Sequence, residues 1–396
     1  MAFGDFTVDR NSTKYVLGSG GTIISYPTDE PAFEFNSDGS YKGLLVEPAS
    51  TNQIRNGSAT GSTTGVIGSG GAFPTNWADG GAGGLTREII GTGTENGVAY
   101  IDIKMSGTAS ATQSAIYFES VTQISTADGE TWTLSAFIKN VDTTSIYNSA
   151  NFIYVNYNST PAFASALTQV ITPTTDLIRY EANKTLSGAT IASTRPGITF
   201  YLTSGNTYDF TVRIGWVQME ESPIATSPIP TTTASVTRVK DDITQTSASS
   251  LIGQTEGTLY VEVDWRETSG VLQYLLSAND GTGNNRIVIR KNTGDSLNML
   301  LVSDSSTLTD QGESSTSYSG IQKLAFAYAN NDFEFYRNGS SVSTDTAGDI
   351  TSLATVANID LGQAFNASSQ ANMHIRAVAL YPKRLSDAEC EALTTL

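Results

Sequence analysis

The sequence predicts an all-β protein built from two β-sandwich (jelly-roll-like) domains, with an N-terminal arm and a short C-terminal helix. Short stretches in which apolar and polar residues alternate recur through most of the chain, which is typical of half-buried strands. Gly, Ser and Thr are frequent between these stretches, as expected of many turns. With 396 residues, the chain is long enough for two or three domains.

Residues 1–72 are expected to form an arm followed by a Gly/Ser-rich linker. Asp38-Gly39 separates Phe33–Phe35 from Tyr41 and predicts a tight hairpin. So small a segment cannot bury a core alone and must pack on something else. Two interpretations stay open: a strand pair that completes a sandwich, or an anchor to a larger assembly. Residues 56–72 consist mostly of Gly, Ser, Thr and Ala, which predicts a flexible linker or a long surface loop.

Residues 73–235 are expected to form the first sandwich. Its strands are predicted at 98–105, 114–118, 131–139, 152–157 and 198–202. Trp132 allows two interpretations, a platform on which a sugar stacks or a core residue. Leu134 and Ala136 share its face of the strand, which favours the core.

The last strand of this domain leads into a junction. Val212, Ile214 and Trp216 alternate, so we expect them on one face. Three prolines follow, at positions 223, 228 and 230. Because proline cannot donate to a strand ladder, the sheet should end here. Residues 236–255 are then expected to be an exposed linker to the next domain.

Residues 256–396 are expected to form the second sandwich. Its strands are predicted at 259–265, 271–277, 286–290, 323–328, 333–337 and 375–381. Ser386 and Glu389 have the spacing of a capping box, so a helix should cover about 387–394. Leu385 and Cys390 flank the box as a hydrophobic staple. Cys390 is therefore expected to be a buried small hydrophobe and not a reactive thiol.

Several of these residues resemble those of bacteriophage virion appendage proteins. Around the junction they are Gln218-Met219-Glu220, Ile229-Pro230-Thr231 and Val236-Thr237-Arg238. Near the N-terminus they are Phe6–Arg10, Pro31–Phe35 and Gly43–Asn52. In that class the junction joins a carbohydrate-binding-module-like jelly roll to a laminin-G or concanavalin-like sandwich. The resemblance implies that residues 73–235 are of the first type and residues 256–396 of the second.

The same resemblance implies a function. It describes a structural virion protein, a head or tail fibre or a capsid decoration, that is made in the cytoplasm of a host bacterium. Such a protein would display lectin-like sandwiches to host cell-surface glycans and would not be an enzyme. Its partners would be other virion proteins and copies of itself, most simply in a trimer. A purely structural decoration protein without a ligand remains an alternative.

Composition narrows the partners and cofactors. The formal net charge of −17 disfavours nucleic acid and anionic membranes, since both repel an acidic surface. No stretch approaches the roughly 20 consecutive apolar residues of a membrane span, and we expect no signal peptide. The single cysteine, Cys390, cannot form an intrachain disulfide. The single histidine, His374, has no second histidine or cysteine to complete a zinc set, so no metal or cofactor is expected.

The candidate glycan-binding residues lie in two loops of the second sandwich. They are Asp280, Asn284, Asn285, Arg286 and Asn366, which offer carboxylate, amide and guanidinium groups on a chain with two nearby glycines. Such groups pair well with adjacent sugar hydroxyls. The same residue types also form ordinary turns, so both interpretations stay open.

One acidic motif raises the alternative of an enzyme. Glu262, Asp264 and Glu267 match Glu-x-Asp-x-x-Glu, which resembles the catalytic strand of one family of concanavalin-fold glycoside hydrolases, so the alternative is a glycan-degrading depolymerase. The simpler interpretation is a first strand with apolar residues inside and acids facing water. We favour that reading and expect no catalytic residues. For the pair Glu220 and Glu221, a structural calcium site and solvated turn acids are both considered, and the second is favoured.

Overall fold

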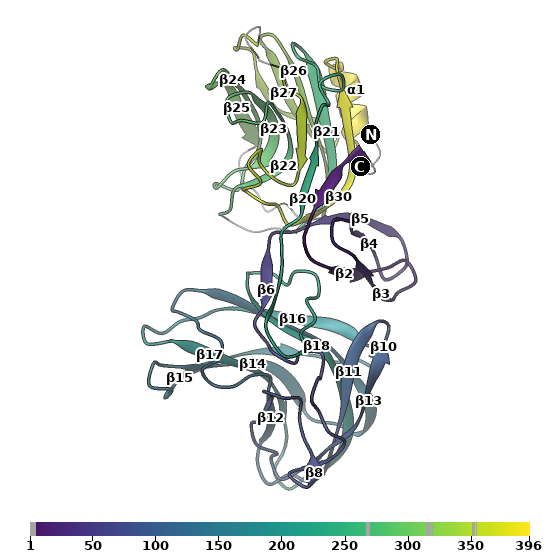
Figure 1. Ribbon diagram of the computed structural model, residues 1–396, viewed down its shortest axis with the longest axis vertical. Coiled ribbons are helices and arrows are strands. Elements are labelled where there is room, and N and C mark those ends of the chain that lie inside the picture. The colour runs from purple at the N-terminus through teal and green to yellow at the C-terminus, as the bar shows by residue number, and fades with distance from the viewer. Residues whose placement is uncertain (1–4, 267–269, 314–317, 319, 351–352, 354) are drawn as a thin grey trace. The chain divides into compact units, whose positions relative to one another are not determined.

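The computed structural model divides into two compact units (Figure 1). It describes residues 5–266, 270–313, 318, 320–350, 353 and 355–396. Met1–Ala49 and Val239–Leu396 form one unit, here called the terminal unit, and Ser50–Arg238 form the other, the central unit. The all-β prediction is confirmed, because both units are sandwiches of β-sheets and the described residues contain a single α-helix.

These boundaries differ from the expected ones. Residues 1–49 are not a separate arm, because strands within them are hydrogen-bonded into the sheets of the C-terminal sandwich. The chain changes unit at 49/50 and again at 238/239, so neither 56–72 nor 236–255 joins two domains. The central unit is therefore inserted in sequence between two parts of the terminal unit.

The terminal unit consists of two seven-stranded sheets. In order across sheet I, the strands are β1 (Thr7–Asp9), β20 (Asp242–Gln245), β29 (Asn358–Leu361), β22 (Gln273–Asn279), β23 (Arg286–Lys291), β24 (Leu297–Ser303) and β25 (Ser306–Glu313). Across sheet II they are β28 (Ser340–Asp345), β27 (Asp332–Arg337), β26 (Gly320–Ala329), β21 (Gly257–Trp265), β30 (Met373–Tyr381), β5 (Tyr41–Val46) and β4 (Phe33–Phe35). A separate hairpin joins β2 (Lys14–Leu17) and β3 (Ile23–Tyr26).

The inner faces of sheets I and II form one apolar core. On β21, the alternating residues Leu259, Val261, Val263 and Trp265 all lie in it, as their periodicity predicts. The N-terminal strands also contribute, since Val8, Leu44 and Val46 belong to the same cluster. Of the two interpretations of the N-terminal residues, the strand pair that completes a sandwich therefore describes the structure.

Buried charges hold the N-terminal residues on the terminal unit. Asp241 accepts from the Arg10 guanidinium at 2.9 Å and from the Lys14 ammonium at 2.6 Å. Lys14 also lies 3.1 Å from the Glu47 carboxylate. All four side chains are at most 1 % exposed, so each charge is neutralised inside the protein. Removing one partner would leave an uncompensated buried charge, which is strongly destabilising.

The chain ends in the predicted helix, α1 (Asp387–Thr394). The Ser386 Oγ accepts the Glu389 N–H, and the Ser386 N–H donates to the Glu389 carboxylate at 2.8 Å, so the capping box is confirmed. Leu385 and Cys390 pack together against the outer face of sheet II. Burial raises the pKa of the Cys390 thiol to about 11, which confirms a packed side chain and not a reactive one.

The central unit is a sandwich of a seven-stranded and a five-stranded sheet. Across sheet III the strands are β16 (Ile178–Thr185), β13 (Thr131–Ser145), β18 (Thr207–Glu221), β11 (Val98–Thr108), β10 (Thr86–Glu95), β7 (Gly65–Ile67) and β8 (Gly70–Gly71). Across sheet IV they are β15 (Phe163–Ile171), β14 (Ser149–Tyr157), β17 (Ser193–Tyr201), β12 (Gln113–Tyr117) and β9 (Ala78–Asp79). Residues 56–72 are part of this unit, since β7 pairs with β10.

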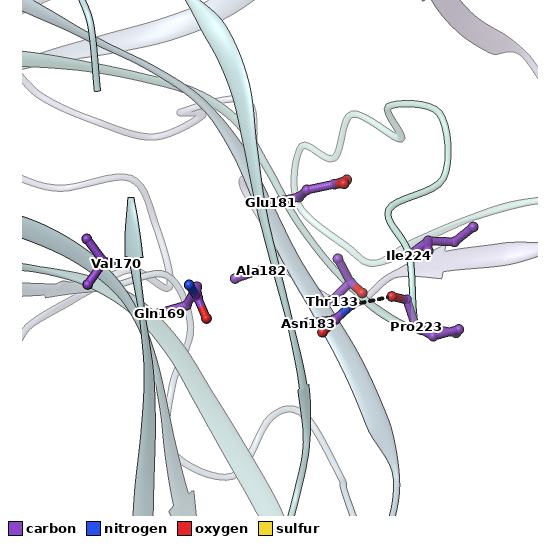
Figure 2. Close-up of a pocket in the computed structure, with 8 residues that line it drawn as sticks. All are labelled: Thr133, Gln169, Val170, Glu181, Ala182, Asn183, Pro223 and Ile224. Atoms are coloured by element: carbon purple, nitrogen blue, oxygen red, sulfur yellow. Dashed lines mark hydrogen bonds between the residues drawn. The ribbon is translucent and has the colours of Figure 1, made fainter. Parts of the chain in front are cut away.

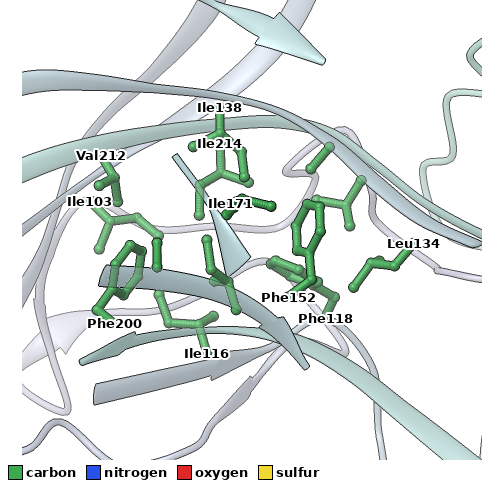
Figure 3. Close-up of a cluster of buried hydrophobic side chains, with 14 of the residues drawn as sticks. Ile103, Ile116, Phe118, Leu134, Ile138, Phe152, Ile171, Phe200, Val212 and Ile214 are labelled. Atoms are coloured by element: carbon green, nitrogen blue, oxygen red, sulfur yellow. The ribbon is translucent and has the colours of Figure 1, made fainter. Parts of the chain in front are cut away.

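The core of the central unit lies between sheets III and IV. Ile103, Ile138 and Ile214 come from sheet III and meet Phe152 and Phe200 of sheet IV (Figure 3). Trp132 is 3 % exposed and belongs to this cluster, which confirms its core interpretation. Its indole Nε1–H donates to the Glu130 carboxylate at 2.9 Å, so its polar atom is also satisfied.

Trp216 departs from the expected face of its strand. Val212 and Ile214 point into the core as predicted, but Val217 takes the inward place that strict alternation would give to Trp216. The pairing of β13 with β18 shifts register here, and Trp216 has a positive φ of 38°. This β-bulge turns Trp216 to the other face, where its ring meets Phe137 edge-on at 6.3 Å.

A buried amide ties the start of the central unit to its end. Asn52 Nδ2 donates to the carbonyls of Val217 at 3.0 Å and Ile229 at 2.9 Å. Its Oδ1 accepts from the N–H groups of Ile54 and Met219. The neighbouring strands β6 (Ser50–Asn52) and β19 (Val236–Arg238) also pair with each other. The residues after β18 therefore belong to a folded unit and not to an exposed linker.

Candidate functional site

A pocket of about 260 Å³ lies at the edge of the central unit. Eight residues line it: Thr133, Gln169, Val170, Glu181, Ala182, Asn183, Pro223 and Ile224 (Figure 2). They come from β13, β15, β16 and the turn after β18. The pocket thus forms where β15 of sheet IV and β16 of sheet III, the edge strands on one side of the sandwich, approach each other.

Strand geometry positions the polar groups of this pocket. Thr133 and Asn183 are direct partners in the β13–β16 ladder. Glu181 is two residues from Asn183 on β16 and therefore lies on the same face. The Asn183 Nδ2 donates to the Pro223 carbonyl at 2.7 Å, which holds the turn after β18 over the edge of the sheet. Gln169 reaches in from β15, where its Oε1 accepts from the Lys184 ammonium at 2.9 Å.

The lining combines hydrogen-bonding groups with a small apolar surface. Glu181 has no side-chain hydrogen bond or ion pair with any residue that the structure describes, so its carboxylate is free to accept. Asn183 Oδ1 and Gln169 Nε2 add an acceptor and a donor. Val170 and Ile224 supply methyl groups beside them. A few convergent polar groups on a partly apolar wall suit a small polyhydroxylated ligand.

The candidate glycan-binding residues at 280–286 are engaged within their own loop. Asp280 accepts from the Thr282 N–H at 2.8 Å and from Asn285 Nδ2 at 2.9 Å. Asn285 is buried, and its Oδ1 accepts the Asp304 N–H. Asn284 Oδ1 accepts from the Ser305 hydroxyl at 2.9 Å. These contacts are those of ordinary turns, and the loop's role in binding stays a prediction.

The structure brings the second candidate loop close to the first. A Cβ placed on Gly283 would lie 3.2 Å from the Phe365 ring, so the loop that carries Asn366 packs directly against residues 280–286. Arg286 donates to the Gly283 carbonyl. Asn366 Oδ1 accepts from the Ser368 hydroxyl and N–H, again within a turn. The predicted residues are thus neighbours, but most of their polar atoms already have partners.

The acidic motif on β21 is only partly described. Glu262 accepts from the Arg376 Nε at 2.7 Å, which fixes its carboxylate on the outer face of sheet II. Asp264 pairs across the ladder with His374 of β30. Glu267 lies outside the described residues. Two acids therefore face outward, as the simpler interpretation expects, and one of them is held in an ion pair.

His374, the only histidine, forms a buried pair with Glu34. The two side chains meet at 2.5 Å. Burial opposes ionisation of Glu34, but the hydrogen bond from His374 and the charge of Lys42 outweigh it and lower the pKa of Glu34 to about 2. Burial lowers the pKa of His374. At neutral pH a neutral imidazole therefore donates its Nε2–H to an ionised Glu34. This pair links β4 to β30 and is structural.

A second buried acid lies on the outer face of sheet I. Asp360 is 5 % exposed and accepts from Asn279 Nδ2 at 2.5 Å. Burial, together with the nearby charge of Asp242, raises the pKa of Asp360 to about 6. Gln363 donates to Asp242 and holds the second carboxylate in place. No sequence pattern singled out this cluster, because its members lie far apart in the chain.

Glu220 does not fit either interpretation considered for it. It is fully buried and not a solvated turn acid. Its Oε1 accepts from the Gln218 amide at 2.6 Å and the Thr226 N–H at 2.9 Å. Its Oε2 accepts from the hydroxyls of Ser50 and Thr226. All of these donors are protein groups, so the carboxylate acts as an internal acceptor that holds the end of β18. Glu221 is exposed.

Two general searches concern only the described residues. Within them, no group of three or more His, Cys, Asp or Glu side chains is placed to hold a metal ion. The same part of the chain has no helix that is both long enough and apolar enough to cross a membrane.

No protein-family description matches this sequence, and no curated protein matches it. Three solved structures resemble part of it. One is a carbohydrate-binding module, CBM40, of the Ruminococcus gnavus IT-sialidase bound to α2,3 sialyllactose (19 % identity, TM-score 0.32, 36 % of this chain and 84 % of that chain). The others are domain 4 of the Geobacillus stearothermophilus arabinanase AbnA (15 %, 0.32, 39 % and 73 %) and a Limulus polyphemus pentraxin (12 %, 0.29, 35 % and 70 %). At these TM-scores the likeness is partial, and no ligand or activity follows from it for this chain.

The pocket in the central unit was not predicted from the sequence. Its polar residues stand at positions 133, 169, 181 and 183, on three different strands. Each alone reads as an exposed strand residue. Only the pairing of β13 with β16, and the approach of β15, place them around one space.

Proposed function

We propose that this protein is a structural, non-enzymatic component of a bacteriophage virion, a fibre or a capsid decoration, that binds glycans on the host surface. It would be made in the host cytoplasm and act on the assembled particle, in contact with other virion proteins. The resemblance at the junction and the N-terminal residues supports the virion role. The two β-sandwiches suit display at a surface, because sandwich edges and loops offer binding sites on a rigid frame.

The observation that carries the glycan-binding part is the pocket of the central unit. Its volume of about 260 Å³ suits a single sugar unit, and its walls offer carboxylate, amide and methyl groups. Sugars are recognised by directional hydrogen bonds to hydroxyls combined with apolar contact to C–H faces. The loop at 280–286 is the second candidate site, with the restriction that its side chains already have partners in the loop.

Glycan-array binding by the full chain tests the proposal. We expect selective binding that a Glu181→Ala, Asn183→Ala double variant loses at least tenfold. The control is the Asn284→Ala, Asn285→Ala, Arg286→Ala variant of the loop, which should bind as the natural protein does. Loss in the loop variant alone would move the site to the terminal unit. Absence of binding by the natural protein would favour decoration without a ligand.

The depolymerase alternative has its own test. If Glu262 served as a catalytic carboxylate, Glu262→Gln would abolish glycan cleavage by the purified protein while leaving the fold intact. We expect no cleavage by the natural chain and no change in any glycan-cleaving activity of particles that carry the variant. Detection of the chain in purified particles by mass spectrometry, with labelled antibodies to place it on head or tail, tests the virion role.

A further inference from the structure

Strand β15 of the central unit is an unprotected sheet edge. Within the part of the chain that the structure describes, it is hydrogen-bonded to β14 on one side and to no strand on the other. We propose that β15 is a self-association edge, which pairs antiparallel with the β15 of a second copy of this chain. The pairing would centre on Phe163–Thr168, because Gln169 and Val170 belong to the pocket beside β16.

The edges of the other large sheets are guarded by charge. Sheets I to IV end in eight strands, and charged residues occur in six of them: β1 (Asp9), β25 (Asp310, Glu313), β28 (Asp345), β4 (Glu34), β16 (Arg179, Glu181, Lys184) and β9 (Asp79). A seventh, β8, has only two residues, both glycine. Exposed edge strands of natural proteins normally carry charges or prolines that block pairing with another chain. β15, nine residues long, carries neither.

The side chains of β15 are also unusually apolar for an exposed strand. Phe163 is 66 % exposed and Val170 is 59 % exposed, and these are two of the most exposed large apolar side chains in the described residues. Ala166 and Thr168 stand opposite Val155 and Ile153 of β14 and line the outer face of sheet IV. A flat, uncharged edge of this kind is a template for a further strand.

The charge distribution identifies the partner as a second copy. The chain has a net charge of −17, so most of its surface repels another copy. Residues 143–175 contain no Asp, Glu, Lys, Arg or His, and they include the whole of β15. Two copies can therefore meet at this edge without opposing like charges. Antiparallel pairing of one strand with itself creates a two-fold axis, which closes the assembly as a dimer.

Light scattering on the full chain tests the pairing. We expect a mass twice that of one chain over a wide range of concentrations. Ala166→Lys and Thr168→Lys should each reduce it to the mass of a single chain, because a two-fold axis would place like charges together. Thr307→Lys, on the exposed edge strand β25, is the matched control and should stay dimeric. Circular dichroism and thermal unfolding verify that each variant is folded.

Cysteine cross-linking provides a second readout that does not depend on weakening the protein. The natural Cys390 is fully buried, so a cysteine introduced on β15 is the only accessible thiol among the described residues. Residues that face each other across an antiparallel pair come close enough for a disulfide. At least one of Ala164→Cys, Ala166→Cys and Thr168→Cys should form a covalent dimer under mild oxidation, and Thr307→Cys should not. A single-chain mass for the natural protein, a trimer, or equal cross-linking in the control would overturn the proposal.

Discussion

At the scale of single residues, burial decides what each acidic group does. Asp241 lies between two buried cations and Glu34 receives a hydrogen bond from His374, so both carboxylates are stable as ions. Asp360 lies in a similarly buried place with no cation at hand, and its pKa is raised. The same side chain type thus stabilises the fold at two positions and opposes it at a third.

We expect Asp360→Asn to stabilise the protein at neutral pH. The pKa of Asp360 is raised from 3.8 to about 6 on folding, so the folded state holds its proton more tightly than the unfolded state. The resulting stability is present below pH 3.8 and is lost as the pH rises through 6. At pH 7, a shift of about two units corresponds to roughly 3 kcal/mol, which the asparagine should largely restore.

Denaturant unfolding at pH 3.5 and pH 7 measures this effect. Asp360→Asn should differ little from the natural chain at the lower pH and should be more stable at the higher one. Asp9→Asn, on an exposed strand position, is the control and should change neither value. An equal effect at both pH values would show that Asp360 does not titrate between them.

At the scale of elements, short polar contacts decide where strands begin and end. The capping box at Ser386 starts α1, and a bulge at Trp216 reverses the faces of β18. The amide of Asn52 connects the first and last segments of the central unit. Such contacts contribute little area, yet they determine which residues reach the core.

We expect Asn52→Ala to destabilise the central unit by about 2–4 kcal/mol. The substitution leaves two carbonyls and two N–H groups buried without their partner, and each unsatisfied group costs about 1 kcal/mol or more. Scanning calorimetry of the full chain should show one transition at lower temperature and the other unchanged. Asn11→Ala, at an exposed position, is the control. A shift shared by both transitions would indicate that the two units unfold together.

At the scale of the whole molecule, the terminal unit is built from both ends of the sequence. Phe6, Val8, Leu44 and Val46 belong to its core, although nearly two hundred residues of the central unit separate them from the rest. The central unit, by contrast, is one continuous segment whose ends pair through β6 and β19.

This organisation predicts how fragments behave. Residues 50–238 should fold alone, whereas residues 239–396 should not, because they lack three sheet strands and the partners of the buried Asp241. Co-expression with residues 5–49 should restore solubility. Circular dichroism and thermal unfolding of each fragment provide the measurement. A stably folded 239–396 fragment would show that the N-terminal strands are dispensable.

Limited proteolysis of the full chain follows from the same division. Residues 225–229 are buried and residues 236–238 form β19, so the stretch from 228 to 253 should resist cleavage in the way a folded segment does. The sequence alone had suggested the opposite, an exposed linker with the first cuts.

Local patterns in the sequence were sufficient for much of this protein. Alternation identified the principal strands, since apolar side chains on every second residue can only be buried together on one face of a sheet. The capping box identified α1, and the neighbours of Trp132 on its strand indicated that it is buried. In each case the information lies within a few residues of the element concerned.

Only the tertiary structure decided which strands share a sheet and what the polar residues do. Pairings such as β5 with β30 join segments more than three hundred residues apart, and their energy comes from ladder hydrogen bonds and burial that no local window contains. The same holds for the pocket around Asn183, the buried acid Asp360 and the unguarded edge β15. Each depends on what lies beside it in space, whereas the sequence determines only what lies beside it in the chain.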